Sequence, residues 1–281
     1  GYTDLWIGHV KGVADVLANY PSYPDADLYE HPKYAKMFQT RYTLAMTDRA
    51  LPEIGDTGQT GKQGLTGSSH DHVAAFERFG TKEYAQLAYA LGGGKIEDLY
   101  SDVFALDVAG TQERIRKIIE EHGPLQRPAE NLTGFGLAAL RTGKGDDQRG
   151  AWVYYGRTRG HGHLDALNLG YFGFTMSLLP DLGYPEFADN NARRKEWTSN
   201  TIAHNTVVVD PKPQAIHWVG TPHGFAATDR VQYVDVSAPK VYPQTTVYRR
   251  AVAQVKVDDA NSYLVDVFRV VGGKDHHLSY H

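Results

Sequence analysis

The chain has 281 residues, of which 41% are hydrophobic and 22% charged, as in an ordinary globular protein long enough to bury a substantial core. Its formal net charge of −4 argues against a general nucleic-acid or anionic-membrane surface, and the lack of cysteine excludes disulfides and cysteine-ligated zinc. No stretch approaches the roughly 20 apolar residues that a membrane helix needs.

Up to about residue 125 the pattern predicts helices. In residues 2–21, Trp6, Val10, Val13 and Leu17 recur at spacings of four and three, which predicts one apolar helix face. Several of the later helical segments end in glycine, a usual stop signal. These segments are 31–48, 71–80, 81–94 and 110–123.

From about residue 134 the period becomes two, and Val, Tyr, Thr and Phe become frequent, which predicts strands. The connections are short and mostly not helical, so an antiparallel sandwich is favoured over a parallel α/β sheet. The expected strands lie in 134–143, 149–157, 169–179, 204–210, 229–237, 245–257 and 262–273. Two prolines interrupt residues 123–134, so we expect an α+β protein with a helical domain at 1–128 and a β-sandwich domain at 129–281.

Two glycine-rich segments invite a phosphate-loop interpretation that their spacing does not support. In residues 55–64, Asp56 stands where the first glycine of such a loop should be, and Gln63 follows Lys62 in place of Ser or Thr. In residues 91–95 no strand precedes the glycines. We therefore expect both segments to be turns between helices.

The stretch "GHGHLDALNLG", residues 160–170, contains His161 and His163, whose side chains would share one face of an extended strand. Asp181 ends an apolar run just before a turn, and His204 stands at the start of a strongly β-forming segment. Imidazole and carboxylate are ligands that zinc accepts, so these residues are candidates for a metal site. On residue types alone, both histidines of the pair could bind the metal.

A partial likeness to another class keeps one alternative open. "HGHLD" is similar to the His-x-His-x-Asp-His motif of metallo-β-lactamase-type hydrolases, but Ala166 replaces the final histidine. The alternative is a zinc-dependent hydrolase that uses His161, His163 and Asp165 with an open metal position. A second alternative is a carbohydrate-binding module without catalysis.

The order of the features resembles the heparinase II/III-like polysaccharide lyases. The helical part is followed by "FGLAALRTG", "GHGHLDALNLGYFGF", "LLPDLGYPE" and "TIAHNTVVVD", and then by a long antiparallel β region. The resemblance is strongest over residues 134–210. It implies an (α/α) toroid joined to a β-sandwich, and cleavage of a uronic-acid polysaccharide by β-elimination.

The resemblance also implies a role for each matching residue. His161 would be catalytic and face the substrate cleft, while His163, Asp181 and His204 would hold a structural zinc ion. Tyr2 is the candidate acid/base tyrosine, although with eighteen tyrosines in the chain it could equally be an ordinary packing residue. The groups that neutralise the substrate carboxylate would lie upstream of Tyr2, so we expect this chain to be a piece of a longer protein.

The expected partner is an acidic polysaccharide or oligosaccharide, and a homodimer is a further option. We expect no nucleic acid partner and a periplasmic or secreted location. Alginate, heparin or heparan sulfate, chondroitin, hyaluronan and gellan-like polymers all remain open, and so does endo or exo action. The basic segment 190–197 is one candidate for binding sulfated substrates.

Overall fold

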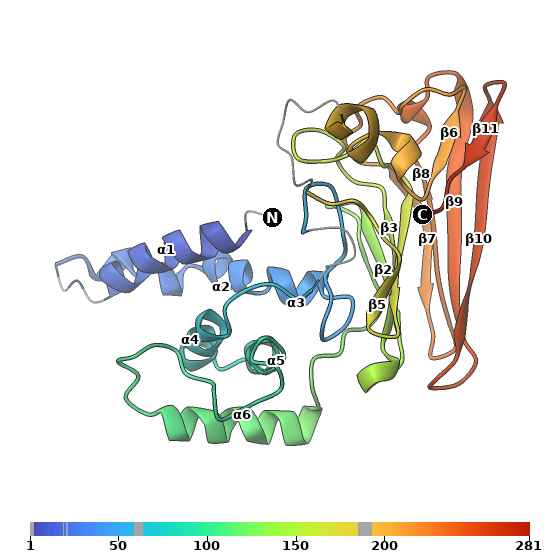
Figure 1. Cartoon of the computed structure of the whole chain (residues 1–281). Helices are drawn as coiled ribbons and strands as arrows, with labels where there is room; N and C mark the ends of the chain where they lie inside the picture. Colours follow the sequence, from blue (N-terminus) through green and yellow to red (C-terminus); the bar gives the residue numbers. More distant parts are fainter. Residues whose placement is uncertain (1–2, 19, 21, 59–63, 185–192) are drawn as a thin grey trace. The chain divides into compact units, whose positions relative to one another are not determined.

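The computed structural model describes residues 3–18, 20, 22–58, 64–184 and 193–281. Two compact units can be separated: unit 1 contains residues 1–51 and 65–127, and unit 2 contains 52–64 and 128–281 (Figure 1). A helical part and antiparallel sheets confirm the α+β class. The domain division at residue 128 stays a prediction, and it did not anticipate that residues 52–64 belong with the strands. Among the described residues, no helix has the length and apolar character needed to cross a membrane.

Unit 1 is built from helices that surround an aromatic-rich core. The helices are α1 Thr3–Ala18, α2 Pro32–Phe38, α3 Thr40–Leu44, α4 Ser69–Phe79, α5 Lys82–Leu91 and α6 Val108–His122, with 3-10 turns at Pro24–Ala26 and Leu28–Glu30. Ser68 caps α4 by accepting a hydrogen bond from the backbone N–H of Asp71, and Gly80 ends this helix in the left-handed conformation. Phe38 and Tyr84 lie edge to face in the core, with ring centroids 6.3 Å apart.

The predicted apolar face of the first helix is wrong. Trp6 is 63% exposed and Val13 is 54% exposed, whereas Ile7 and Ala14 are buried and Val10 packs partly against the same core. The predicted face and the buried face both consist of residues at spacings of three and four, and both contain Val10. Periodicity alone could therefore not distinguish the two faces.

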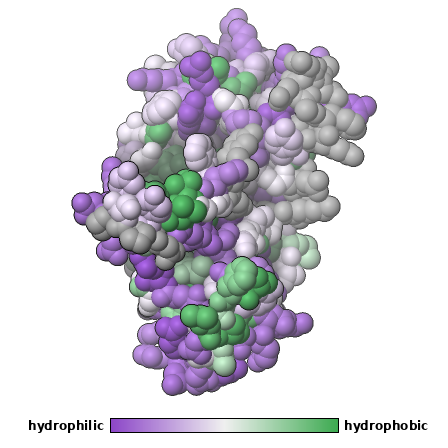
Figure 2. Space-filling view, turned by 90° about the vertical axis from the view of Figure 1, so that its left-hand side faces the viewer, coloured by the Kyte–Doolittle hydropathy of each residue, from purple (hydrophilic) through white to green (hydrophobic). Residues whose placement is uncertain are grey.

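The connection between α5 and α6 exposes apolar side chains. Val103, Phe104 and Leu106 are each more than 80% exposed. Figure 2 shows a hydrophobic patch in its lower part, over this connection. Unit 1 therefore has exposed apolar side chains in addition to its buried core.

In its described residues, unit 2 contains three antiparallel sheets. The five-stranded sheet is formed by β1 Glu130–Leu132, β2 Leu137–Thr142, β3 Arg149–Tyr154, β4 Asn168–Gly173 and β5 Met176–Leu179. The four-stranded sheet is formed by β7 Thr221–Ala227, β8 Val231–Ser237, β9 Thr245–Lys256 and β10 Ser262–Gly272, in the order β10-β9-β8-β7. The short strands β6 Val207–Val209 and β11 His276–Leu278 pair with each other.

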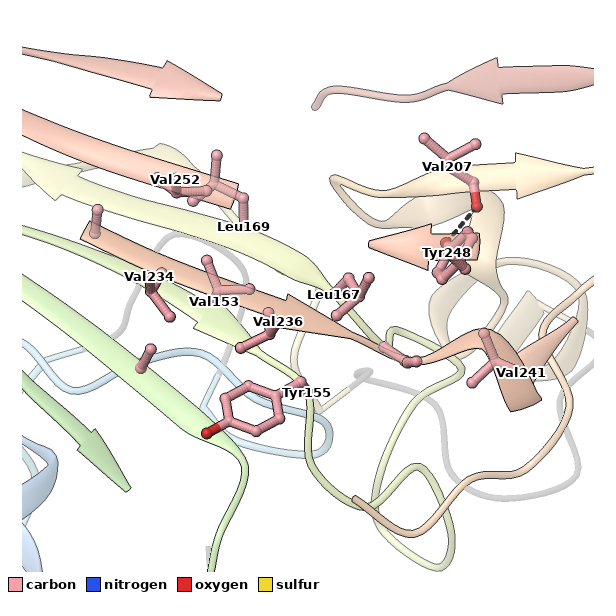
Figure 3. Packing of buried hydrophobic residues seen from close by; sticks show 14 of the residues in the cluster. Val153, Tyr155, Leu167, Leu169, Val207, Val234, Val236, Val241, Tyr248 and Val252 are labelled. Atoms are coloured by element: carbon pink, nitrogen blue, oxygen red, sulfur yellow. Dashed lines mark hydrogen bonds between the residues drawn. The ribbon is translucent and has the colours of Figure 1, made fainter. Parts of the chain in front are cut away.

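The two larger sheets pack face to face through a shared core. Figure 3 shows Val153 from β3 close to Val234 and Val236 from β8, and all three are buried. Tyr248 from β9 is also buried, and its hydroxyl donates a hydrogen bond of 2.6 Å to the carbonyl of Val207 (Figure 3). Two apolar inner faces that interdigitate in this way define a sandwich, and β6 is tied to it.

One buried arginine connects this core to the segments that carry the candidate site residues. Arg250 in β9 donates hydrogen bonds to the carbonyls of Leu167 and Asn205, and Asp266 in β10 balances its charge through contacts of 2.9 and 2.7 Å. Leu167 follows the His-x-His stretch, and Asn205 follows His204. The sandwich therefore holds both segments in fixed positions.

Candidate metal and acid-base site

Three buried side chains from separate segments of unit 2 come together. His163 lies between β3 and β4, Asp181 follows β5, and His204 lies three residues before β6. Each offers one ligand atom, and these atoms all lie within 4.8 Å of one another. We call these residues the three-donor group. The sequence predicted this set, and the fold assembles it.

The Asp181 carboxylate lies between the two imidazoles. Its Oδ1 is 3.3 Å from Nδ1 of His163, and its Oδ2 is 2.8 Å from Nδ1 of His204. Asn168 donates to Oδ2 and the backbone N–H of Gly183 donates to Oδ1, each at 3.0 Å. Carboxylate and imidazoles are therefore fixed by their surroundings as well as by each other.

The electrostatics of the group favour a bound cation. Burial would raise the pKa of Asp181, but the neighbouring imidazoles of His204 and His163 hold it below its usual range. Burial would lower the pKa of His163, but hydrogen bonds with Asp181 and Asp56 raise it to about 9. The carboxylates thus stabilise positive charge on a buried imidazole, and they would equally stabilise a metal ion bound in place of that proton.

The buried donor atoms of the three-donor group show whether these residues suit a metal ion. Within the described residues, Nε2 of His204 is buried without a hydrogen-bond partner, and buried Nδ1 of His163 has only its long contact of 3.3 Å with Asp181. Such atoms are costly unless something binds them, and imidazole nitrogens beside a carboxylate are borderline-soft donors that suit a divalent transition metal. The three-donor group can therefore bind a metal ion.

Asp165 is close to this group but is not one of its three donors. Its carboxylate is fully buried, both oxygens lack a hydrogen-bond partner among the described residues, and burial raises its pKa to about 6. The hydrolase alternative requires His161 and Asp165 as ligands beside His163. The donor group of the described residues contains neither of them, so the arrangement does not favour that alternative.

His161 occupies a different environment from His163. Its side chain is 58% exposed, and its Nδ1 is 2.9 Å from Oδ2 of Asp56. Nε2 of His163 is 3.3 Å from the other oxygen, Oδ1, of the same carboxylate, whose side chain is only 3% exposed. One buried carboxylate thus bridges an exposed imidazole and a buried one.

A cation completes the surroundings of Asp56. The Arg194 guanidinium donates a hydrogen bond of 2.5 Å to Oδ2. Burial would raise the pKa of Asp56, but hydrogen bonds from His163, Arg194 and His161 outweigh it and hold the pKa below its usual range. Asp56 is therefore ionised at neutral pH and can only accept hydrogen bonds.

The backbone around Asp56 approaches the His-x-His stretch very closely. The N–H of Asp56 donates to the carbonyl of His161 at 2.8 Å. Gly55 has φ +55°, and a Cβ at this position would lie 2.4 Å from the carbonyl oxygen of His161 and 2.9 Å from Cα of Gly162. Only glycine permits both this conformation and this approach. The described residues 55–58 form bends between α3 and α4, as predicted, but they belong to unit 2 and lie against the His-x-His stretch.

Comparison with known proteins identifies the domain that contains the three-donor group. Residues 149–281 match the family model described as heparinase II/III-like, C-terminal. This part of the chain is a heparinase II/III-like domain. The predicted family resemblance is thereby confirmed. His161 and the three-donor group lie inside the heparinase II/III-like domain, whereas Asp56 lies outside it.

Two known proteins are similar to this chain. A protein named alginate lyase from Stenotrophomonas maltophilia (strain K279a) is 27% identical over 176 residues, which cover 56% of this chain and 23% of that protein. Crystal structures of the heparan sulfate lyase HepC from Pedobacter heparinus, mutant and non-mutant, each give a TM-score of 0.50 at 14% identity, covering 92% of this chain and 44% of that one. The HepC likeness shows a shared fold. The matched part is less than half the length of either protein.

Sequence reasoning placed some residues of the site and missed others. Tyr2 lies outside the described residues, so its role stays a prediction, as does the catalytic role of His161. Asp56 and Arg194 were missed, and so was Glu53, whose buried carboxylate accepts a hydrogen bond of 3.0 Å from the backbone N–H of Asp181. Asp56 and His161 are 105 positions apart, and no local period or motif marks that pairing.

Proposed function

We propose that the chain is part of a polysaccharide lyase that cleaves a uronic-acid-containing polysaccharide by β-elimination. The observation that carries the proposal is an exposed imidazole, His161, held by a buried carboxylate beside a buried group able to bind a metal ion. The heparinase II/III-like domain and a relative named as a lyase support this reaction type.

The chemistry requires groups of the kind that this site offers. Removal of the C5 proton next to a carboxylate builds negative charge, so the site must supply a base for the proton, an acid for the leaving 4-oxygen and donors to the carboxylate. We propose that His161 accepts a proton, either from C5 or from a tyrosine phenol that then acts on C5. Tyr2 remains our candidate for that tyrosine, because its phenol could donate to the leaving oxygen and accept after ionisation.

We propose that the metal ion is zinc and that His163, Asp181 and His204 hold it. When bound, it would supply a structural crosslink and a positive charge. The residues themselves show what such a crosslink would join: the end of β5, the start of β6 and the stretch that carries His161. No activated water is needed for an elimination, which agrees with the complete burial of the three side chains.

Near the His-x-His stretch, exposed groups suited to a polyanionic sugar support the proposed substrate class. The Arg157 guanidinium lies 5.0 Å above the ring of Trp218, which is 68% exposed. The backbone N–H of His217 donates to the hydroxyl of Thr158 at 2.7 Å, which fixes Trp218 relative to this stretch. We propose that Trp218 stacks on a sugar ring and that Arg157 binds a carboxylate or sulfate. Since such polymers are extracellular, we propose a periplasmic or secreted location.

The function is tested on the full-length protein with a panel of uronic-acid polymers: alginate, heparan sulfate, chondroitin, hyaluronan and gellan-like glucuronan. Elimination creates a C4–C5 double bond conjugated with the carboxylate, so ultraviolet absorbance should rise with at least one polymer. New reducing ends without a rise in absorbance would indicate a hydrolase. Binding without any product would indicate a module without catalysis.

A further inference from the structure

We propose that Asp56 is a positioning residue whose single carboxylate sets the tautomers of both His161 and His163, and sets them oppositely. The catalytic consequence of this inference rests on the proposed lyase function. The tautomers themselves can be measured without it. Asp56 lies outside the matched heparinase II/III-like domain, in a segment of unit 2 that is distant in sequence from the histidines.

The Asp56 carboxylate accepts hydrogen bonds from two imidazole rings. An ionised carboxylate has no proton to give, so each imidazole nitrogen that contacts it must carry the hydrogen. Asp56 Oδ2 contacts Nδ1 of His161, and Oδ1 contacts Nε2 of His163. His161 therefore carries a hydrogen on Nδ1, and His163 carries one on Nε2. Nδ1 of His163 is equally close to the Asp181 carboxylate, so His163 would become the neutral Nε2–H tautomer when a metal ion replaces the hydrogen on Nδ1.

The remaining nitrogens then have complementary tasks. His161 keeps its lone pair on Nε2, on a ring that is more than half exposed and suited to accept a proton. With a metal ion bound, His163 would direct the lone pair of Nδ1, the atom that faces Asp181 within the three-donor group, toward that ion. A carboxylate that orients the second nitrogen of a metal-binding imidazole or of a catalytic imidazole is a recurring device. Here one carboxylate serves both.

Two further contacts make Asp56 a rigid reference point. Its backbone N–H is bonded to the His161 carbonyl at 2.8 Å, so the ring and the main chain of His161 are both fixed by the same residue. The guanidinium of Arg194, itself 11% exposed, keeps the carboxylate charged in a buried place. An ion pair with a purely structural role would need only Arg194, and it would not require contacts with two imidazoles.

The first test is made on the wild-type protein loaded with zinc. Nitrogen NMR of histidine-labelled protein distinguishes Nδ1–H from Nε2–H tautomers, and the signals can be assigned from His161→Gln and His163→Gln variants. We expect His161 to carry its hydrogen on Nδ1 and His163 on Nε2. The opposite tautomer at either residue would overturn the proposal. This measurement does not depend on any variant of Asp56 folding.

The second test compares Asp56→Asn with Asp235→Asn. Asp235 in β8 is also a carboxylate bonded to an arginine, Arg249, but it lies outside the site, so its variant controls for the loss of an ion pair. Asparagine keeps one acceptor and replaces the other with a donor, so it cannot hold both imidazoles in their original tautomers. We expect a changed tautomer at His161 or His163 in Asp56→Asn, and unchanged tautomers in Asp235→Asn.

The same pair of variants gives two functional readings. Asp56→Asn should lower kcat by about 100-fold or more with little change in KM, because a catalytic imidazole in the wrong tautomer binds substrate but does not accept its proton. It should also weaken zinc binding by about 10–100-fold. Unchanged tautomers, kcat and zinc affinity would overturn the proposal. If the wild-type protein cleaves no polymer, the proposed function fails, while the tautomer and zinc measurements still decide the role of Asp56.

Discussion

Replacing Gly55 by alanine tests how much the contact between residues 55–56 and the His-x-His stretch contributes to stability and activity. An alanine there would adopt a left-handed φ of +55° and place its Cβ 2.4 Å from the carbonyl oxygen of His161. The left-handed conformation costs a residue with a Cβ about 1–2 kcal/mol. The overlap with backbone atoms cannot be relieved by a side-chain rotation, so the segment must retreat and lose the hydrogen bond from Asp56 to His161, worth about 1 kcal/mol.

Gly145 supplies the matched control. It also lies in unit 2 and has φ +54°, but a Cβ there would meet nothing within 4 Å. Gly145→Ala therefore measures the conformational cost alone. Gly55→Ala should lower the free energy of unfolding by about 1–3 kcal/mol more than Gly145→Ala does, which is the usual cost of overpacking. It should also lower lyase activity, because the Asp56 carboxylate moves with the segment.

The assay is urea unfolding followed by circular dichroism, with both variants measured at the same pH and zinc concentration. Because the two substitutions share their chemistry and their φ, the difference between them isolates the close approach. Equal losses of stability would refute the packing of residues 55–56 against the His-x-His stretch. The positioning role of Asp56 would then lose its structural support.

Three further predictions concern the metal site, the sandwich and the surface. His163→Ala should abolish the gain in melting temperature that zinc gives the wild type, whereas His161→Ala should keep that gain and lose activity; equal effects in both would mean that both are ligands. Burial would raise the pKa of Asp266, but its hydrogen bonds with Arg250 hold it below the usual value, so the pair stabilises the fold above about pH 4 and loses this as the pH falls further. Asp266→Asn should therefore cost about 3 kcal/mol at pH 7, because it leaves a buried guanidinium unbalanced, and much less under acid conditions; a deficit independent of pH would contradict this. Trp218→Ala should raise KM several-fold with little change in kcat, and an unchanged KM would remove it from the substrate surface.

The strands were predictable where one face of a sheet is buried. Residues 245–257 and 262–273 are rich in strand-forming Val, and burial alternates from Tyr248 to Gln254 in β9 and along most of β10. Residues 221–227 form an edge strand that is exposed on both faces and contains Pro222 and Gly224. Without a buried face there is no alternation to detect, so this strand was missed.

The residues of the candidate site were likewise predictable only where a local sequence pattern marks them. His161, His163, Asp181 and His204 stand beside strands whose pattern is local, so their order along the chain was informative. Asp56 has no such neighbour pattern. Its function as an acceptor arises only when a distant glycine-rich turn approaches the backbone of residue 161, and a contact of that kind is a property of the fold rather than of a motif. The sequence of residues 55–64 excluded a phosphate-binding loop but did not indicate the contact with His161.

The central claim is that this chain belongs to an enzyme that breaks a uronic-acid polymer by elimination. Digestion of a susceptible polymer by the full-length protein in water enriched with heavy oxygen, followed by mass spectrometry, tests it directly. Elimination predicts unsaturated products that contain no oxygen from the solvent, and their loss in His161→Ala. Saturated products that carry one solvent oxygen for each bond cleaved would contradict the account and establish hydrolysis.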